Sequence, residues 1–225
     1  KKNESGFLLS HPDTLLACAL KIAASKFQMN THCIGDSANR YILDIYNKVL
    51  GSDKNRRWRI EHAQVINEGD FTKFKANNII PSVQPTHATS DMYWVYDRLG
   101  KERTSNAYAY QKLIDNAGMI AGGSDFPVEG INPFKGIYAA VVRQDLKRIP
   151  ANGFEQDNKI SRIDAIKSFT IWAAYAGFEE KNKGSLEQGK AADFIVIDKD
   201  IINCNEYEIP YIKVLKTFSD GKQVY

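Results

Sequence analysis

Thr31-His32-Cys33-Ile34-Gly35-Asp36 is the first of three stretches that decide the expected fold; the others are Ile60-Glu61-His62-Ala63-Gln64 and Gly122-Gly123-Ser124-Asp125. Each stretch places an imidazole or a carboxylate at the end of an apolar, strand-like run. Strand-like and helix-like segments alternate around them, a pattern typical of parallel strands joined by helical crossovers. The sequence therefore predicts an α/β fold with potential metal ligands at the ends of three strands.

Hydrophobic periodicity and turn residues give the expected elements. Strands are expected over residues 29–34, 58–65, 79–84 and 119–123. Helices are expected over residues 10–27, 36–50, 68–76, 108–116, 134–144 and 160–178, and a polar-aromatic loop over residues 86–106. Ser10 followed by Asp13 resembles a capping box for the first helix. Beyond residue 184, short strand-like runs predict a small β element, with Asp220-Gly221 as a hairpin turn.

The composition excludes several classes of protein. The chain has 225 residues, 43% of them hydrophobic, which is enough for one or two folded domains. Its net charge of +3 is dispersed, and the densest basic cluster is too small for a nucleic-acid footprint: Arg56, Arg57 and Arg59. No apolar run reaches the roughly 20 residues of a membrane span. We therefore expect neither nucleic acid nor a membrane as a partner.

Cysteine usage indicates the redox environment. The three cysteines are an odd number without the spacing of a disulfide framework: Cys18, Cys33 and Cys204. Free thiols are typical of a reducing compartment, so we expect a cytoplasmic location.

The three stretches contain the chemistry of a metal site. His32 and His62 lie near the C-terminal ends of expected strands, the edge where catalytic residues gather in a β/α barrel. Imidazole is a good zinc ligand, and Asp125 can complete a catalytic site and accept a proton from water. A single histidine at a strand end is ordinarily a satisfied polar residue. Spacing alone leaves both readings open, although three such residues on separate strands favour a shared cation.

Five segments resemble the amidohydrolase superfamily, and are most similar to its family-3 branch of YtcJ-like and N-substituted formamide deformylase-like proteins. They are His32-Cys33-Ile34-Gly35-Asp36, Arg59-Ile60-Glu61-His62-Ala63-Gln64, Ser82-Val83-Gln84-Pro85-Thr86-His87, Gly123-Ser124-Asp125-Phe126-Pro127 and the tail over residues 184–196. The resemblance extends from about residue 6 to the C-terminus.

The resemblance implies a metal-dependent hydrolase with a (β/α)8 TIM-type barrel and one or two metal ions, usually zinc. Residues 1–180 would be the C-terminal half of the barrel, strands five to eight, and residues 181–225 part of a small β-sandwich domain. His32 and His62 would match the histidines of strands five and six, and Asp125 the aspartate of strand eight. His87, just past strand seven, would point towards the substrate. The expected reaction is hydrolysis of C–N bonds in a small amide, formamide or cyclic amide.

The chain also departs from that family pattern. The His-x-His pair of strand one and the lysine of strand four have no counterpart, since the one remaining histidine is His11, before the first helix. We expect these ligands to lie upstream of residue 1, so that this fragment alone binds zinc weakly and is inactive. A mononuclear-metal deaminase remains an alternative, although its general-acid glutamate has no convincing equivalent. A non-catalytic interaction module is another. Open half-barrel edges suggest a possible homo-oligomer.

Other residues have two interpretations each. Asp36 is expected to be the N-cap of the helix that follows, or else a hydrogen-bond partner of a ligand histidine. Cys33 should face away from His32 on the strand. Arg59 and Glu61 should share the face opposite His62, and should pair either with each other or with groups on the surrounding helices. Four apolar residues in the expected loop would form a substrate wall or only pack it: Met92, Tyr93, Trp94 and Tyr96.

Overall fold

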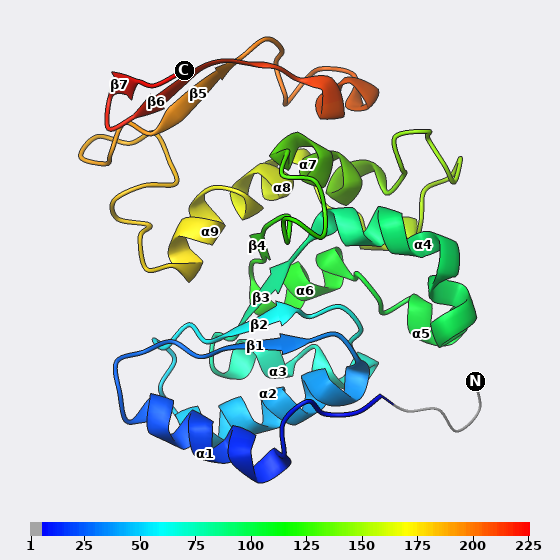
Figure 1. Cartoon of the computed structure of the whole chain (residues 1–225), viewed down its shortest axis with the longest axis vertical. Helices are drawn as coiled ribbons and strands as arrows, with labels where there is room; N and C mark the ends of the chain where they lie inside the picture. The colour runs from blue at the N-terminus through cyan, green and yellow to red at the C-terminus, as the bar shows by residue number, and fades with distance from the viewer. Residues whose placement is uncertain (1–5) are drawn as a thin grey trace. The chain divides into compact units, whose positions relative to one another are not determined.

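The structure, a computed structural model, describes residues 6–225 as two compact units (Figure 1). The first unit contains residues up to 83 together with residues 92–120, and the second contains residues 84–91 and 121–225. Among the described residues, no helix is long and apolar enough to cross a membrane. The three cysteines are not joined in disulfides, as the sequence predicted.

The first unit is built on three parallel strands, β1 (Asn30–Cys33), β2 (Arg59–His62) and β3 (Ile80–Val83). Each is shorter than the apolar run that predicted it. Figure 1 shows helices on one side of these strands: α1 (Pro12–Ala23), α2 (Asp36–Leu50) and α3 (Lys73–Ala76). The unit also contains η1 (Glu68–Asp70) and α6 (Tyr110–Ala117). The expected alternation of strands and helices is therefore confirmed.

An aromatic pair lies in the core of the first unit. Tyr46 of α2 and Trp58, just before β2, are fully buried, with ring centroids 4.8 Å apart and nearly perpendicular planes. Burying a large side chain of this kind stabilises the fold by about 1.5–3 kcal/mol. The Tyr46 hydroxyl lies 2.6 Å from Thr31 Oγ1 on β1, so α2 is fixed to the strand that precedes it.

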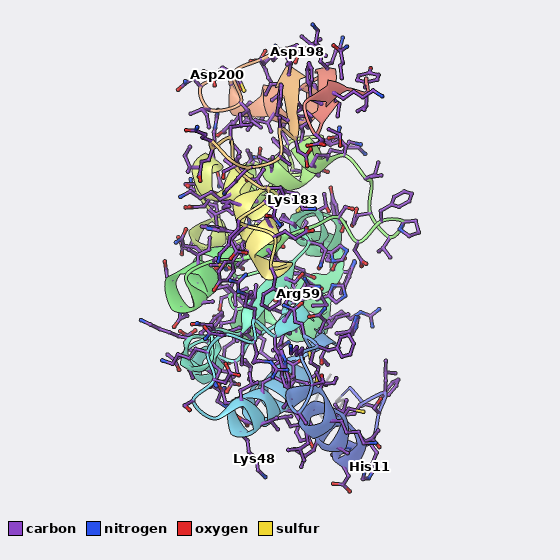
Figure 2. The ribbon with its side chains drawn as sticks, turned by 90° about the vertical axis from the view of Figure 1, so that its left-hand side faces the viewer. His11, Lys48, Arg59, Lys183, Asp198 and Asp200 are labelled. Carbon is purple, nitrogen blue, oxygen red and sulfur yellow. The ribbon has the colours of Figure 1, made fainter. Side chains whose placement is uncertain are left out.

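The helix ends correct two cap predictions. Helix α2 covers the expected residues and ends at Gly51, whose φ of 57° suits glycine. Its N-cap, however, is Gly35, and Asp36 is the first helical residue, with its carboxylate accepting a hydrogen bond from the Ser37 amide at 2.8 Å. Helix α1 is capped by His11, whose Nδ1 accepts from the Asp13 amide, and not by Ser10. Figure 2 shows His11 at the start of α1 and Lys48 extending away from α2.

The predicted loop over residues 86–106 is wrong. It forms α4 (Pro85–Leu99) and α5 (Lys101–Thr104), separated by Gly100 with a φ of 74°. Pro85 directly follows the expected strand over residues 79–84, and it occupies the first position of α4, where its fixed φ and missing N–H suit a helix. The predicted helix over residues 160–178 divides near Thr170 into α8 (Arg162–Ser168) and α9 (Ile171–Ala176).

The second unit contains β4 (Ala121–Gly122), α7 (Pro133–Val142), η2 (Gln156–Asn158), α8 and α9, followed by η3 (Glu206–Tyr211) and the tail strands. The tail is an antiparallel sheet of β5 (Phe194–Ile197), β6 (Val214–Ser219) and β7 (Lys222–Gln223). Phe194 and Phe218 face each other across it as a stacked pair, with centroids 4.4 Å apart. The predicted hairpin turn is confirmed, since Asp220 and Gly221 have φ of 50° and 75°.

Candidate metal centre

The histidine pair of the first unit lies at the ends of two adjacent strands. His32 is on β1 and His62 is the last residue of β2, and these strands pair in parallel. The ring centroids are 4.4 Å apart and the ring planes meet at 77°. A zinc ion binds imidazole nitrogens at about 2.0–2.1 Å, so the two rings are close enough to be candidate ligands of one ion.

The backbone at the end of β2 makes this pairing possible. His62 lies opposite Cys33 in the ladder, so strict alternation would place His62 on the face of Cys33, away from His32. His62 and Ala63 instead have φ of 74° and 43°, a left-handed conformation that is uncommon outside glycine. The strand therefore turns at His62, and the imidazole meets His32. Such strain costs about 1–3 kcal/mol per residue and gathers at functional sites.

Neighbouring segments hold the backbone beyond this turn. The Val65 amide donates to the carbonyl of Ile34, which follows β1, at 3.0 Å. Val65 also forms an antiparallel bridge with Ala107. The side chain of Gln64 donates to the Tyr108 hydroxyl at 2.8 Å in a buried contact. The residues that follow His62 are therefore fixed on both sides.

Charged residues lie on the same face of the sheet as His32. Glu61 is paired with His32 in the strand register, and its carboxylate accepts a hydrogen bond from Arg59 Nε at 3.0 Å. Both side chains are about a quarter exposed, and Figure 2 labels Arg59 on its strand. Of the two alternatives for these charges, the structure shows Arg59 paired with Glu61.

Cys33 is the last residue of β1 and is buried. It is 1% exposed, and burial raises the pKa of its thiol to about 12. The thiol is therefore neutral near pH 7. This agrees with the prediction that Cys33 faces away from His32.

The second unit contains a histidine and a carboxylate that lie close together. His87 Nε2 is 3.7 Å from Asp125 Oδ2, with His87 largely buried and the Asp125 side chain 37% exposed. His87 was expected in a loop just past a strand, but it lies in the first turn of α4. Asp125, like His62, has a positive φ, of 60°. Two of the candidate ligands therefore adopt a backbone conformation that is costly for most residues.

A second contact supports this arrangement. Ser90 Oγ, also in α4, donates to Glu129 Oε1 at 2.6 Å and lies 3.3 Å from the His87 carbonyl oxygen. The loop that contains Asp125 and Glu129 is therefore joined twice to the start of α4. Sequence reasoning did not single out Glu129, because a glutamate in a loop has no pattern of its own.

The aromatic residues expected in a loop lie on α4. Met92 is buried, which fits packing. Tyr93, Trp94 and Tyr96 are 60%, 44% and 43% exposed, so for these three the substrate wall stays a prediction. Asn39, which the sequence analysis passed over, is fully buried behind the end of β1, and its side chain bonds to carbonyls there. Its place one turn into the helix after His32 was the available signal.

These features define a class of protein: an α/β fold with a parallel sheet and a pair of histidines at the C-terminal ends of two adjacent strands. The amidohydrolase family profile matches residues 6–225. This chain belongs to the amidohydrolase family, as its motifs predicted.

Three curated relatives support this assignment. The chain is 37% identical to Protein LONG AFTER FAR-RED 3 of Arabidopsis thaliana, over 99% of this chain and 38% of that protein. It is 32% identical to the putative amidohydrolase YtcJ of Bacillus subtilis, over 96% and 41%. It is 26% identical to the N-substituted formamide deformylase of Arthrobacter pascens, over 90% and 38%. The chain therefore spans about two fifths of the length of these relatives.

Solved structures give the fold. A metal-dependent hydrolase from Pyrococcus horikoshii OT3 superposes with a TM-score of 0.80 at 27% identity, over 91% of this chain and 40% of that one. Such neighbours are TIM-barrel proteins of the amidohydrolase type. The predicted fold class is confirmed: the parallel strands and their helices are part of a (β/α)8 barrel.

Proposed function

We propose that this chain belongs to a metal-dependent hydrolase that cleaves C–N bonds of small amides, formamides or cyclic amides. Three observations support the proposal: the family membership, the relatives that bear amidohydrolase and deformylase names, and the histidine pair. The pair is the observation that carries it. Its edge-to-face rings depend on a strained backbone at His62, and such strain persists where a function requires it.

In this proposal His32, His62 and Asp125 hold the metal, and zinc is the expected ion. Two imidazoles and one carboxylate are a typical donor set for a catalytic zinc site with an open position. Zinc bound there would supply Lewis acidity that polarises the substrate carbonyl and makes water acidic near neutral pH. The residues present thus suit the ion chemically, and the remaining ligands would come from a part of the protein that precedes residue 1.

Asp125 would also carry the proton. Its carboxylate is more than a third exposed and lies 3.7 Å from His87 Nε2. It would accept a proton from the attacking water and deliver it to the departing nitrogen, so that the amine leaves in neutral form. His87 would orient that carboxylate and contact the substrate.

The remaining proposals concern organisation. Residues 1–180 would be the barrel part and residues 181–225 part of the small β domain. The protein would be cytoplasmic and a homo-oligomer, and light scattering of the purified protein would measure its mass. The chain alone would bind zinc weakly and have no turnover, because two imidazoles and one carboxylate lack the ligands of the first strands.

A metal-binding comparison tests the ligands. The longer protein that contains this chain would be prepared as wild type and as His32→Ala, His62→Ala, Asp125→Asn and His11→Ala, and zinc affinity measured by competition with a chromogenic chelator. The first two variants should weaken zinc binding at least tenfold. His11→Ala is the matched control, because His11 is 72% exposed and caps α1. Wild-type affinity in both His32→Ala and His62→Ala would refute the ligand assignment.

A substrate panel tests the reaction. N-formyl amines, N-acyl amines and cyclic amides would be compared with aminated heterocycles, and released amine distinguished from released ammonia. Amine release that is lost in Asp125→Asn supports the proposal. Ammonia release from the heterocycles alone would favour a deaminase instead. Stoichiometric zinc and turnover in the isolated 225-residue chain would refute its proposed inactivity.

A further inference from the structure

The side chain of Asn39 connects the ends of two strands. Asn39 lies in the first turn of α2 and is fully buried. Its Nδ2 lies within hydrogen-bonding distance of four backbone carbonyl oxygens: Gly35 at 2.9 Å, Val65 at 3.1 Å, Cys33 at 3.2 Å and Ile34 at 3.4 Å. One amide group with two protons thus lies at a junction of carbonyls that belong to different segments.

The chemistry of this junction requires a donor. Exchanging the amide oxygen and nitrogen would point an oxygen at four carbonyl oxygens, so the orientation of the amide is fixed. The other amide atom, Oδ1, is buried without a hydrogen-bond partner, and leaving an acceptor unsatisfied costs free energy. The side chain therefore keeps its Nδ2 donor at the four carbonyls although its Oδ1 acceptor is unsatisfied. This indicates that the Nδ2 donor has a specific role.

The four carbonyls flank the histidine pair. Cys33 directly follows His32, and Val65 lies three residues after His62. The ladder between β1 and β2 ends at the pair Cys33–His62. Beyond that point the chain turns through the left-handed residues at 62 and 63, so the regular pairing cannot continue. Asn39 bonds to both segments at the place where the ladder stops.

We infer that Asn39 is a positioning residue for the His32–His62 pair. By donating to Val65 and to the residues after His32, its amide keeps the exits of β1 and β2 at a fixed separation and stabilises the left-handed turn that directs His62 towards His32. The effect on zinc affinity rests on the function proposed above. The effect on the placement of the two rings does not, and the two effects are measured separately.

The same helix offers a matched control. Asn47 also has a partly buried amide whose Nδ2 donates to the carbonyl of Lys73, the first residue of α3, at 3.2 Å, and whose Oδ1 has no partner. Its contact lies away from β1 and β2. Asn39→Leu and Asn47→Leu therefore remove similar hydrogen bonds from one helix with little change in volume, and differ in whether the histidine segments lose a link.

The primary measurement is the ring contact itself. The full 225-residue chain has four histidines, so selective labelling resolves their imidazole signals by NMR without metal. The wild type and Asn47→Leu should show a nuclear Overhauser effect between the His32 and His62 rings. Asn39→Leu should lose this effect. Urea titration, carried out in parallel, measures the unfolding free energy of each variant. A retained effect in Asn39→Leu, at wild-type intensity, would overturn the inference.

A second variant covers the case in which Asn39→Leu does not fold. In Asn39→Ser the hydroxyl can still bond the carbonyl four residues earlier in the helix, as serine commonly does, but it is too short to reach Val65. This variant should also lose the ring contact, and a wild-type contact would overturn the inference. In zinc titrations of the longer protein, the zinc affinity of Asn39→Ser should be lower by about tenfold or more. Losses of this size are typical when a residue that hydrogen-bonds a metal ligand is removed. Wild-type zinc affinity together with an intact ring contact would likewise refute the positioning role.

Discussion

The close approach of Phe169 to α7 gives a quantitative prediction about the second unit. Gly136 is a buried helical residue, and a Cβ added there would lie 2.6 Å from Phe169 Cζ and 3.3 Å from its Cε2. Real Cβ atoms essentially never come that close, so Gly136→Ala must displace the ring. Overpacking of this kind costs about 1–3 kcal/mol. Alanine gains about 1 kcal/mol over glycine in a helix interior, so the net loss should be about 0–2 kcal/mol.

The second substitution isolates the clash. Leucine lacks the outer ring atoms that the new methyl group would meet, so Gly136→Ala in a Phe169→Leu background should be neutral or stabilise by up to about 1 kcal/mol. The interaction energy of the double-mutant cycle should be about 1–3 kcal/mol. The four proteins would be compared by urea unfolding, with Gly130→Ala as a control because nothing lies within 4 Å of its added Cβ. Equal costs of Gly136→Ala in both backgrounds would show that Phe169 does not make the contact described.

Three further predictions follow from buried polar groups of the first unit. Burial raises the pKa of the Cys33 thiol from 9.0 to about 12. The contribution of the neutral thiol to stability is therefore complete below about pH 9 and is lost as the pH rises towards 12. Cys33→Val should flatten the fall of the unfolding free energy at alkaline pH, and an unchanged slope would contradict this. Arg56 donates to the carbonyls of Ile22 and Ala23 at the end of α1, and of Ser25 and Phe27 just after it, at 2.8–3.0 Å. Arg56→Lys should lower the unfolding free energy by about 1–2 kcal/mol, because an ammonium cannot reproduce the planar fork. A loss below about 0.3 kcal/mol would count against this account. Asp70 is 3% exposed and pairs with Arg40 at 2.8 Å and with Lys73 at 2.9 Å. Asp70→Asn should lower the unfolding free energy by about 1–3 kcal/mol in urea unfolding, whereas Asp44→Asn, which removes the exposed partner of Lys73, should lower it by under about 1 kcal/mol. Similar losses for both variants would refute the distinction.

Local signals predicted the helices well where the caps and the periodicity agreed. Residues 36–50 combine a 3.6-residue apolar period with a glycine after the last turn, and α2 has those bounds. The same reasoning failed at α4, because the polar and aromatic residues after Pro85 lack a clear apolar stripe. Proline at a first helical position was the one available signal, and it is equally common in turns.

The sequence pointed to candidate ligands but not to the geometry in which they lie. His32, His62 and Asp125 were recognisable because each ends an apolar run. Alternation along a strand, however, predicts that His62 turns away from His32, and the meeting of their rings depends on a local departure from strand geometry. A left-handed residue other than glycine has no sequence signature, because it is imposed by the contacts that surround it and not by the residue itself.

The turn at His62 has a consequence for how this position tolerates change. A left-handed conformation costs an ordinary residue about 1–2 kcal/mol relative to glycine. His62→Gly would therefore remove the backbone strain and the imidazole together. The variant would lose a candidate ligand, and its unfolding free energy would rise. The chain therefore holds an imidazole at a position where glycine would fold at lower cost.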